Sequence, residues 1–265
     1  MTAAPAILVF DSGLGGLTVF REIARARPDA RLTYVADDAF FPYGTHSEAA
    51  LVARIVPLMG ELIARYIPDL VVIACNTASV QALAALREHH KVPFVGTVPA
   101  IKPACAQSKT KRVSVLGTRA TVAREYTRKL IDDFAQGCDV DLVGSAELAR
   151  IAEAELAGAP VADADLSAEI APCFVDRSGR RTDTVVLACT HFPLLLERLT
   201  QLAPWPVAWI DPAPAIARRV VDLLGGPGDM RQHEAPQVLF TSGKTPSLPL
   251  SRSLVAFGFT AAEPA

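Results

Sequence analysis

One short segment occurs twice in this chain. VVIACNTAS at 71–79 and VVLACTHFP at 185–193 each contain an apolar run, an Ala-Cys pair and polar residues that open a helix-like stretch. Their cysteines, Cys75 and Cys189, are 189 − 75 = 114 positions apart and cannot share one strand–helix unit. The repeat predicts two related halves, each with a cysteine at a strand end. Open α/β sheets bind ligands outside the carboxyl ends of their strands, so two such ends should face each other across a cleft.

Short runs rich in Val, Ile and Leu alternate with longer stretches of helical periodicity. Continuous apolar strands are typical of sheets covered by helices on both faces, so we predict an α/β fold with mainly parallel sheets. Strands are expected near 6–10, 32–36, 70–74, 92–96, 113–117, 140–144, 184–188, 207–210 and 238–241. Helices are expected near 17–27, 47–66, 79–90, 120–135, 147–157, 165–178, 192–202 and 213–224.

Two Pro-rich segments, TVPAIKPA at 97–104 and PWPVAWIDPAPA at 204–215, are expected to be crossovers between two domains. The first domain would be discontinuous, 1–97 plus 210–265, and would carry Cys75. The second would span 98–209 and carry Cys189. No helix candidate falls in the Ser- and Pro-rich tail from Ser242 to Ala265.

Composition excludes several classes of protein. The 265 residues are 51% hydrophobic, enough for a sizeable core, and 26 basic and 28 acidic residues are interspersed to a net charge of −2. Nucleic acid and anionic membranes are therefore poor candidate partners. Apolar runs are far shorter than the ~20 residues of a membrane helix, and the N-terminus does not read as a secretory signal. Five widely spaced cysteines without a CxxC pair indicate neither a disulfide framework nor structural zinc, so we expect a soluble, cytoplasmic protein.

Cys75 and Cys189 are the candidate reactive groups. Each is expected where a strand ends and a helix begins, and the positive end of a helix dipole lowers a thiol pKa and favours the reactive thiolate. A free cysteine elsewhere behaves as a small buried hydrophobe. That second interpretation is preferred for the other three cysteines, at 105, 138 and 173.

The segment FDSGLGGLTV at 10–19 places Asp11 and Ser12 after the first strand, before a Gly-rich turn. Its GxGG spacing fits neither the dinucleotide fingerprint nor a P-loop. Asp11 is a candidate acid/base or orienting group, and helix capping is the alternative. His191, two residues after Cys189, could relay a proton or stabilise a thiolate. No further Cys/His cluster completes a metal site.

Neutral hydrogen-bonding groups lie at the same strand ends. Ser12, Asn76, Thr77 and Thr190 suit a small zwitterion whose carboxylate is neutralised by donors rather than by a buried arginine. The loop ADDAFFPYG at 36–44 adds a further edge, where Tyr43 or the backbone amides near Gly44 could close over a ligand. A plain turn remains the alternative for this loop.

At these residues the chain resembles the glutamate racemases, within the aspartate/glutamate racemase superfamily. The resemblance covers nearly the whole chain, through FDSGLGG, YVADDAFFPYG at 34–44, ACNTAS at 74–79, VPFVGTVPA at 92–100, VLGTRATV at 115–122 and ACTHFPLL at 188–195. It implies two pseudo-symmetric α/β domains, an active site in the interdomain cleft, and no metal, pyridoxal phosphate or nucleotide cofactor. It also implies a homodimer and a role in supplying D-glutamate for peptidoglycan, and so in cell-wall biogenesis and cell shape.

The resemblance also implies residue roles. Cys75 would take the α-proton of D-glutamate and Cys189 that of L-glutamate, with Asp11 and His191 as auxiliary groups beside them. The residues matching substrate-binding positions are Asp11, Ser12, Tyr43, Gly44, Asn76, Thr77, Thr190 and His191.

The sequence leaves other functions open, and some of its residues differ from the usual family pattern. Aspartate or another amino acid could be the substrate, although the PYG loop favours glutamate. A decarboxylase of the arylmalonate type would lack the first thiol. A catalytically silent amino-acid binder or a regulatory protein is the alternative from a different class. Ala36, Asp38, Ala188 and Pro212 depart from the commonest pattern, and Asp38 would weaken anion binding if it pointed inward.

Overall fold

The computed structural model describes residues 4–228 and 235–260. Its strands are β1 (Ala6–Asp11), β2 (Arg31–Ala36), β3 (Leu70–Ile73), β4 (Phe94–Gly96), β5 (Arg112–Thr118), β6 (Asp139–Ser145), β7 (Asp176–Arg177), β8 (Arg180–Arg181), β9 (Thr184–Ala188), β10 (Ala208–Ile210) and β11 (Gln237–Phe240). Its α-helices are α1 (Leu17–Ala26), α2 (Glu48–Tyr66), α3 (Asn76–His89), α4 (Ile101–Gln107), α5 (Arg119–Ala123), α6 (Glu125–Phe134), α7 (Leu148–Leu156), α8 (Asp163–Ile170), α9 (Leu196–Leu202), α10 (Ala213–Leu224) and α11 (Leu248–Ala256). Short 3₁₀ helices are η1 (Asp38–Phe40), η2 (Tyr43–Thr45), η3 (Ala171–Cys173) and η4 (Phe192–Leu195).

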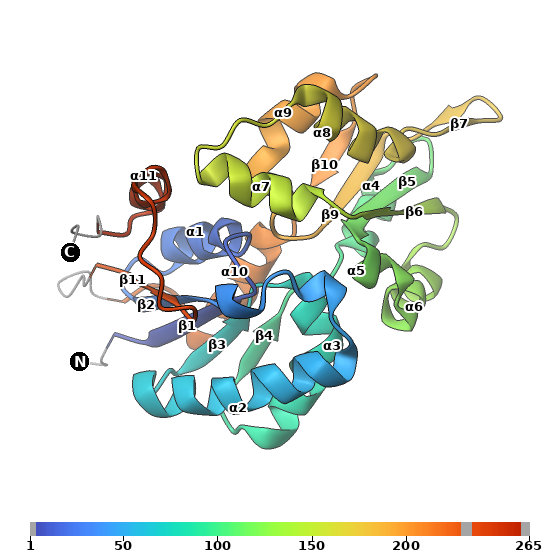
Figure 1. Ribbon diagram of the computed structural model, residues 1–265. Helices are drawn as coiled ribbons and strands as arrows, with labels where there is room; N and C mark the ends of the chain where they lie inside the picture. Colours follow the sequence, from blue (N-terminus) through green and yellow to red (C-terminus); the bar gives the residue numbers. More distant parts are fainter. Residues whose placement is uncertain (1–3, 229–234, 261–265) are drawn as a thin grey trace.

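Two parallel sheets form the centres of two lobes (Figure 1). One sheet has the strand order β11-β2-β1-β3-β4 and the other β10-β9-β5-β6. All neighbouring strands in both sheets are parallel. The predicted α/β fold class is confirmed.

The strand order repeats between the sheets, because β2-β1-β3-β4 matches β6-β5-β9-β10. The register extends the match to single residues: Phe10 pairs with Ile73, two residues before Cys75, and Leu116 pairs with Leu187, two residues before Cys189. The two cysteines therefore occupy equivalent places in two pseudo-symmetric halves.

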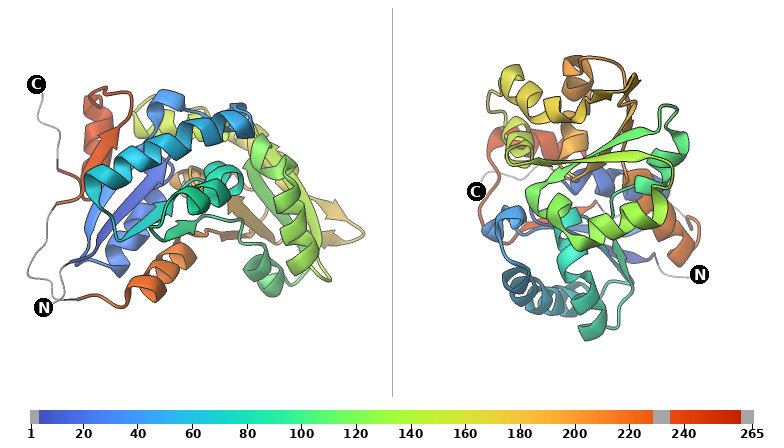
Figure 2. Two further views of the ribbon diagram at one scale, coloured as in Figure 1. Left: turned by 90° about the horizontal axis from the view of Figure 1, so that it is seen from below. Right: turned by 90° about the vertical axis from the view of Figure 1, so that its right-hand side faces the viewer.

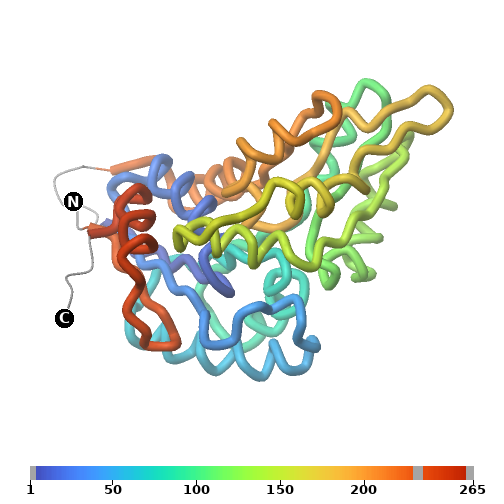
Figure 3. Tube along the Cα trace, turned by 45° about the horizontal axis from the view of Figure 1, so that its top comes forward, coloured from blue at the N-terminus to red at the C-terminus, as the bar shows by residue number. Residues whose placement is uncertain are grey.

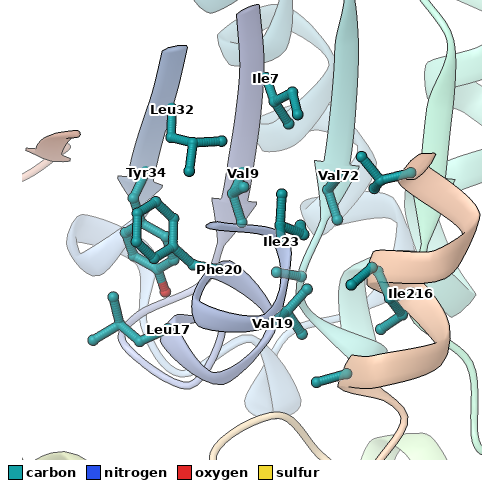
Figure 4. Close-up of a cluster of buried hydrophobic side chains, with 14 of the residues drawn as sticks. Ile7, Val9, Leu17, Val19, Phe20, Ile23, Leu32, Tyr34, Val72 and Ile216 are labelled. Atoms are coloured by element: carbon teal, nitrogen blue, oxygen red, sulfur yellow. The ribbon is translucent and has the colours of Figure 1, made fainter. Parts of the chain in front are cut away.

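Alternation of side chains along the strands builds a core on each face of each sheet. Ile7 and Val9 of β1 pack with Phe20 and Ile23 of α1 and Ile216 of α10 (Figure 4). The intervening β1 residues face α2 and α3 on the other side. In the second sheet α7, α8 and α9 cover one face and α4 with α6 the other. Burial on both faces explains why these strands are nearly continuous apolar runs.

Two helix predictions need correction. The helix expected at 165–178 ends at Ile170, and a β7–β8 hairpin follows, projecting from the rim of the second lobe (Figure 2). Its turn needs the positive φ of Ser178 and Gly179, 53° and 73°, which is the geometry of tight hairpins. The helix expected at 120–135 is split into α5 and α6, because Arg124 is extended at φ −77°, ψ 142°.

Two further helices were not expected. α4 overlaps the segment 97–104, which was expected to be a crossover, and Pro103 is tolerated there because it falls in the first turn. α11 lies within the Ser- and Pro-rich tail, and the Ser247 hydroxyl caps its start. In Figure 3 the red α11 lies beside the yellow-green α7, and Ser253 Oγ donates to the Leu156 carbonyl at 2.8 Å. Within residues 4–228 and 235–260, no helix is long and apolar enough to cross a bilayer.

Candidate active site

A small cavity lies where the carboxyl ends of strands from both sheets meet. Nine of the ten predicted site residues line it, namely Ser12, Tyr43, Gly44, Cys75, Asn76, Thr77, Cys189, Thr190 and His191. Phe41, Pro42, Thr118 and Ala149 also line it. Its volume is about 20 Å³, room for roughly one water molecule. Any amino acid is larger, so ligand entry requires these walls to move apart.

Cys75 is the N-cap residue of α3. Its sulfur accepts a hydrogen bond from the Ala78 N–H at 3.4 Å, and its thiol donates to Ser12 Oγ at 3.6 Å. Burial nevertheless raises the pKa of Cys75 to about 12, with the Asp11 charge adding to the rise. The expectation that the helix N-terminus lowers this pKa is wrong, because desolvation of the thiolate outweighs both hydrogen bonds. At neutral pH Cys75 is a protonated thiol.

Asp11 lies behind the cavity wall and is fully buried. Its Oδ2 accepts hydrogen bonds from the N–H groups of Gly13 and Gly16, at 3.2 and 3.0 Å, and from the Tyr34 hydroxyl at 3.2 Å. Its Oδ1 is buried and has no partner among the described residues. Burial is the largest influence and raises the pKa of Asp11, against the lowering effect of the His191 charge. One oxygen of this carboxyl group is therefore hydrogen-bonded to the Gly-rich turn, and the other has no partner among the described residues.

The Gly-rich turn allows the second lobe to approach closely. A Cβ on Gly15 would lie 2.3 Å from His191 Nδ1, and one on Gly13 would lie 2.0 Å from Glu153 Oε1. Glycine is required at position 15, where a Cβ would also lie 2.6 Å from the His191 backbone nitrogen, whereas a Cβ at position 13 would displace the flexible end of the Glu153 side chain. The turn's composition thus has a structural explanation that does not involve nucleotide binding.

His191 connects the second thiol to a carboxylate. Its Nδ1 lies 3.8 Å from Cys189 Sγ, and its Nε2 lies 2.9 Å from Glu153 Oε1. Burial would lower the pKa of His191, but the hydrogen bonds with Cys189 and Glu153 outweigh it and hold that pKa well above 6.5. His191 is therefore an imidazolium at neutral pH, and it places a positive charge 3.8 Å from the Cys189 sulfur.

Glu153, on α7, was not predicted from the sequence. Its Oε1 also accepts a hydrogen bond from the Leu14 N–H, at 2.8 Å, so one carboxylate joins the two lobes beside the site. Its partners are 139 and 38 residues away along the chain. No local sequence signal could have identified it.

Thr118 was also missed, although its place in the topology marks it. It follows Leu116 as Ser12 follows Phe10, so the two hydroxyls occupy equivalent strand ends. Thr77 Oγ1, from the first lobe, lies 3.3 Å from Thr118 Oγ1 and 3.4 Å from Thr121 Oγ1. The strand order could have revealed Thr118 only once both sheets were known.

Among the neutral groups at the cavity, the Asn76 side chain has two buried polar atoms free to bind a ligand. Both its amide nitrogen and its amide oxygen are buried and have no hydrogen-bond partner within the described part of the chain. Buried polar atoms are normally satisfied. Because Asn76 lines the cavity, a bound polar molecule is the natural partner.

The loop at 36–44, which covers the cavity, is fixed by hydrogen bonds to residues outside the cavity. The Tyr43 hydroxyl donates to Asp37 Oδ2 at 2.7 Å, so it is directed away from a ligand. Asp38 accepts hydrogen bonds from the backbone and side chain of Ser242 and does not line the cavity. Asp38 therefore places no negative charge against a bound anion.

Comparison with known proteins agrees with this arrangement. The family model for Asp/Glu/Hydantoin racemase matches residues 9–220. A glutamate racemase of Brucella canis is 53% identical over 254 residues, which are 95% of this chain and 92% of that protein. The crystal structure of Escherichia coli glutamate racemase, in complex with L-glutamate and the activator UDP-MurNAc-Ala, superposes with a TM-score of 0.88 at 42% identity, covering 97% of this chain and 96% of that one. A glutamate racemase from Bacillus anthracis gives 0.74 at 27% identity, with 90% and 88% covered. This chain belongs to the Asp/Glu/Hydantoin racemase family.

Proposed function

We propose that this protein interconverts L- and D-glutamate by proton transfer between two thiols, without a cofactor. The observation that carries the proposal is that Cys75 and Cys189, from equivalent strand ends of two sheets, line one cavity. Racemisation removes an α-proton from one face and returns one to the other, so two opposed groups suit it. The full-length similarity to glutamate racemases supports glutamate as the substrate.

The charges around the thiols suggest how each direction starts. Cys75 is protonated and can act as the acid, and we propose that Cys189, beside the His191 imidazolium, acts as the base. This state is ready to take the α-proton of L-glutamate at Cys189 and to deliver one from Cys75. D-glutamate requires the reverse state, with Cys75 as base, and we propose that Asp11, through its free oxygen, assists proton movement on that side.

Neutral donors would hold the substrate. We propose that Ser12, Asn76, Thr77 and Thr190, with the loop at Tyr43 and Gly44, bind the carboxylates and the ammonium group. The described cavity lining contains no lysine or arginine. Preoriented donors stabilise the negative charge that develops as the α-proton leaves.

Glutamate should be turned over faster than aspartate, by about 10- to 100-fold in kcat/KM. The shorter side chain moves one carboxylate away from its donors and leaves buried polar groups unpaired, at roughly 1–3 kcal/mol. Circular dichroism of each L-amino acid during incubation with the enzyme measures the ratio. Equal or higher kcat/KM on aspartate contradicts the glutamate assignment. Thermal stabilisation by glutamate without turnover would indicate an amino-acid binder instead.

Exhaustive EDTA treatment followed by dialysis should leave racemisation unchanged, with no pyridoxal phosphate added. The thiols and their neighbours supply every acid and base that the reaction uses, and the described residues contain no group of three or more potential metal ligands. Initial rates before and after treatment test this. Activity that returns only with a metal ion or a cofactor would overturn the mechanism.

We propose two domains, 1–97 plus 210–265 and 98–209, each built around one sheet. We also propose a cytoplasmic homodimer that supplies D-glutamate for peptidoglycan. Sedimentation of the purified protein tests the dimer.

A further inference from the structure

A charged network outside the cavity holds the loop that covers it. Asp37 follows β2 and is fully buried. Its Oδ1 accepts hydrogen bonds from Arg54 Nη2 and Thr241 Oγ1, both at 2.6 Å. Its Oδ2 accepts hydrogen bonds from Arg54 Nε at 3.1 Å and from the Tyr43 hydroxyl at 2.7 Å. One carboxylate thus joins α2, the loop before it and the segment after β11.

The network depends on Asp37 being ionised. Burial alone would raise the pKa of Asp37, but the hydrogen bonds from Arg54, Thr241 and Tyr43 outweigh it and lower that pKa. A buried carboxylate that loses its cation is strongly destabilised. Arg54, whose side chain is 34% exposed, is the one cation paired with Asp37 among the described residues. Arg54 is therefore what allows a carboxylate at this position.

Tyr43 connects the Arg54–Asp37 pair to the cavity. Its hydroxyl is occupied by Asp37, while Tyr43 and Gly44 themselves line the cavity at the start of η2. Within the described chain, the N–H groups of Tyr43 and Gly44 donate to no backbone acceptor. Backbone N–H groups without a protein acceptor need another partner, and a carboxylate bound in the cavity that these residues line is a strong one.

We propose that the Arg54–Asp37 pair is a positioning device that holds the Tyr43 and Gly44 amides in place to bind a substrate carboxylate. Neither Arg54 nor Asp37 lines the cavity. Thr241 adds a tether from the C-terminal part of the chain. The inference rests on the proposed racemase function, because it assigns these amides to the substrate of that reaction.

The test is Arg54→Met, measured as kcat and KM for both enantiomers of glutamate. We expect KM to rise about tenfold in both directions, since one hydrogen bond to a charged group is worth about that much. We expect kcat to stay within about twofold, because loss of binding shared by ground and transition states changes KM alone. Arg65→Met, at an exposed position of the same helix, is the matched control and should change neither constant.

Removing the Asp37 charge together with Arg54 should restore substrate binding. Asp37→Asn combined with Arg54→Met removes the buried charge, while the amide oxygen can still accept the Tyr43 hydroxyl, so KM should return to within about threefold of the unchanged enzyme. Thr241→Val removes only the hydrogen bond from Thr241 to Asp37 and should raise KM about threefold. If Arg54→Met fails to fold, the KM of Thr241→Val tests the proposal instead.

Three results overturn the proposal: unchanged KM in Arg54→Met, a fall in kcat as large as the rise in KM, or a double variant no better than the single one. Loss of racemisation in the unchanged enzyme would instead refute the proposed function itself.

Discussion

Replacing Cys75 or Cys189 by alanine should reduce racemisation about a thousandfold or more in both directions. In the proposed mechanism every turnover uses one thiol as the base and the other as the acid, so neither direction survives with a single thiol. Removing a positioned acid or base costs about 10²- to 10⁴-fold. The rate of optical change, measured separately from L- and D-glutamate with each variant, gives both directions.

The other three cysteines are the matched controls. Cys105, Cys138 and Cys173 do not line the cavity. Alanine at each should leave kcat/KM within about twofold, although burial of Cys105 and Cys173 implies a stability cost of about 1 kcal/mol. Melting temperatures separate that cost from catalysis. Racemisation at a normal rate by either Cys75→Ala or Cys189→Ala would eliminate the two-thiol mechanism.

In deuterated water, the enantiomer formed at early times should carry deuterium at its α-carbon in nearly every molecule, while the remaining substrate stays largely protiated. In the proposed mechanism, Cys189 takes the substrate proton from L-glutamate, and Cys75 delivers a deuteron that it acquired from solvent. From D-glutamate the two thiols exchange roles. Mass spectrometry of the separated enantiomers, sampled below about one-tenth conversion, measures both pools.

The labelling pattern distinguishes two groups from one. A single group serving both faces would either return the substrate's own proton to the product or label both enantiomers together. Equal early deuterium in the two pools, or a protiated product, would therefore contradict opposed acid and base groups. Because labelling needs no variant, its result is independent of any folding defect.

Much of the site could be predicted from sequence because its residues follow strands. A strand that is buried on both faces must be apolar along its length, so the change to polar residues after Ile73 and Ala188 marks the carboxyl ends where Cys75 and Cys189 lie. Ser12 and Thr190 were identified from the same local pattern. The loop at Tyr43 was recognised as an edge of the site, but its two candidate contacts, side chain and backbone, could not be separated.

Residues whose roles depend on distant partners could not be predicted. In the sequence, Glu153 looks like any acidic residue on an amphipathic helix. Its role follows only from its contacts with Leu14 and His191 in the fold. Arg54 is similar, because only the fold places it against Asp37. The helices α4 and α11 were missed because the Pro-rich composition was interpreted as crossover or tail, whereas proline in a first turn permits a helix.

The sequence by itself determined the strand–helix alternation, the repeated cysteine motif and the strand-end chemistry, because hydrophobic periodicity and helix starts are local properties of a chain. Only the tertiary structure decided the protonation of the site. Cys75 has the helix N-terminus that the sequence predicted, yet its pKa rises to about 12, because the loss of water around a buried thiolate outweighs the hydrogen bonds with Ala78 and Ser12. That loss of water arises only when the two lobes close over the same cavity. The imidazolium at His191 also depends on the fold, which places Cys189 and Glu153, the latter 38 residues away along the chain, beside its ring.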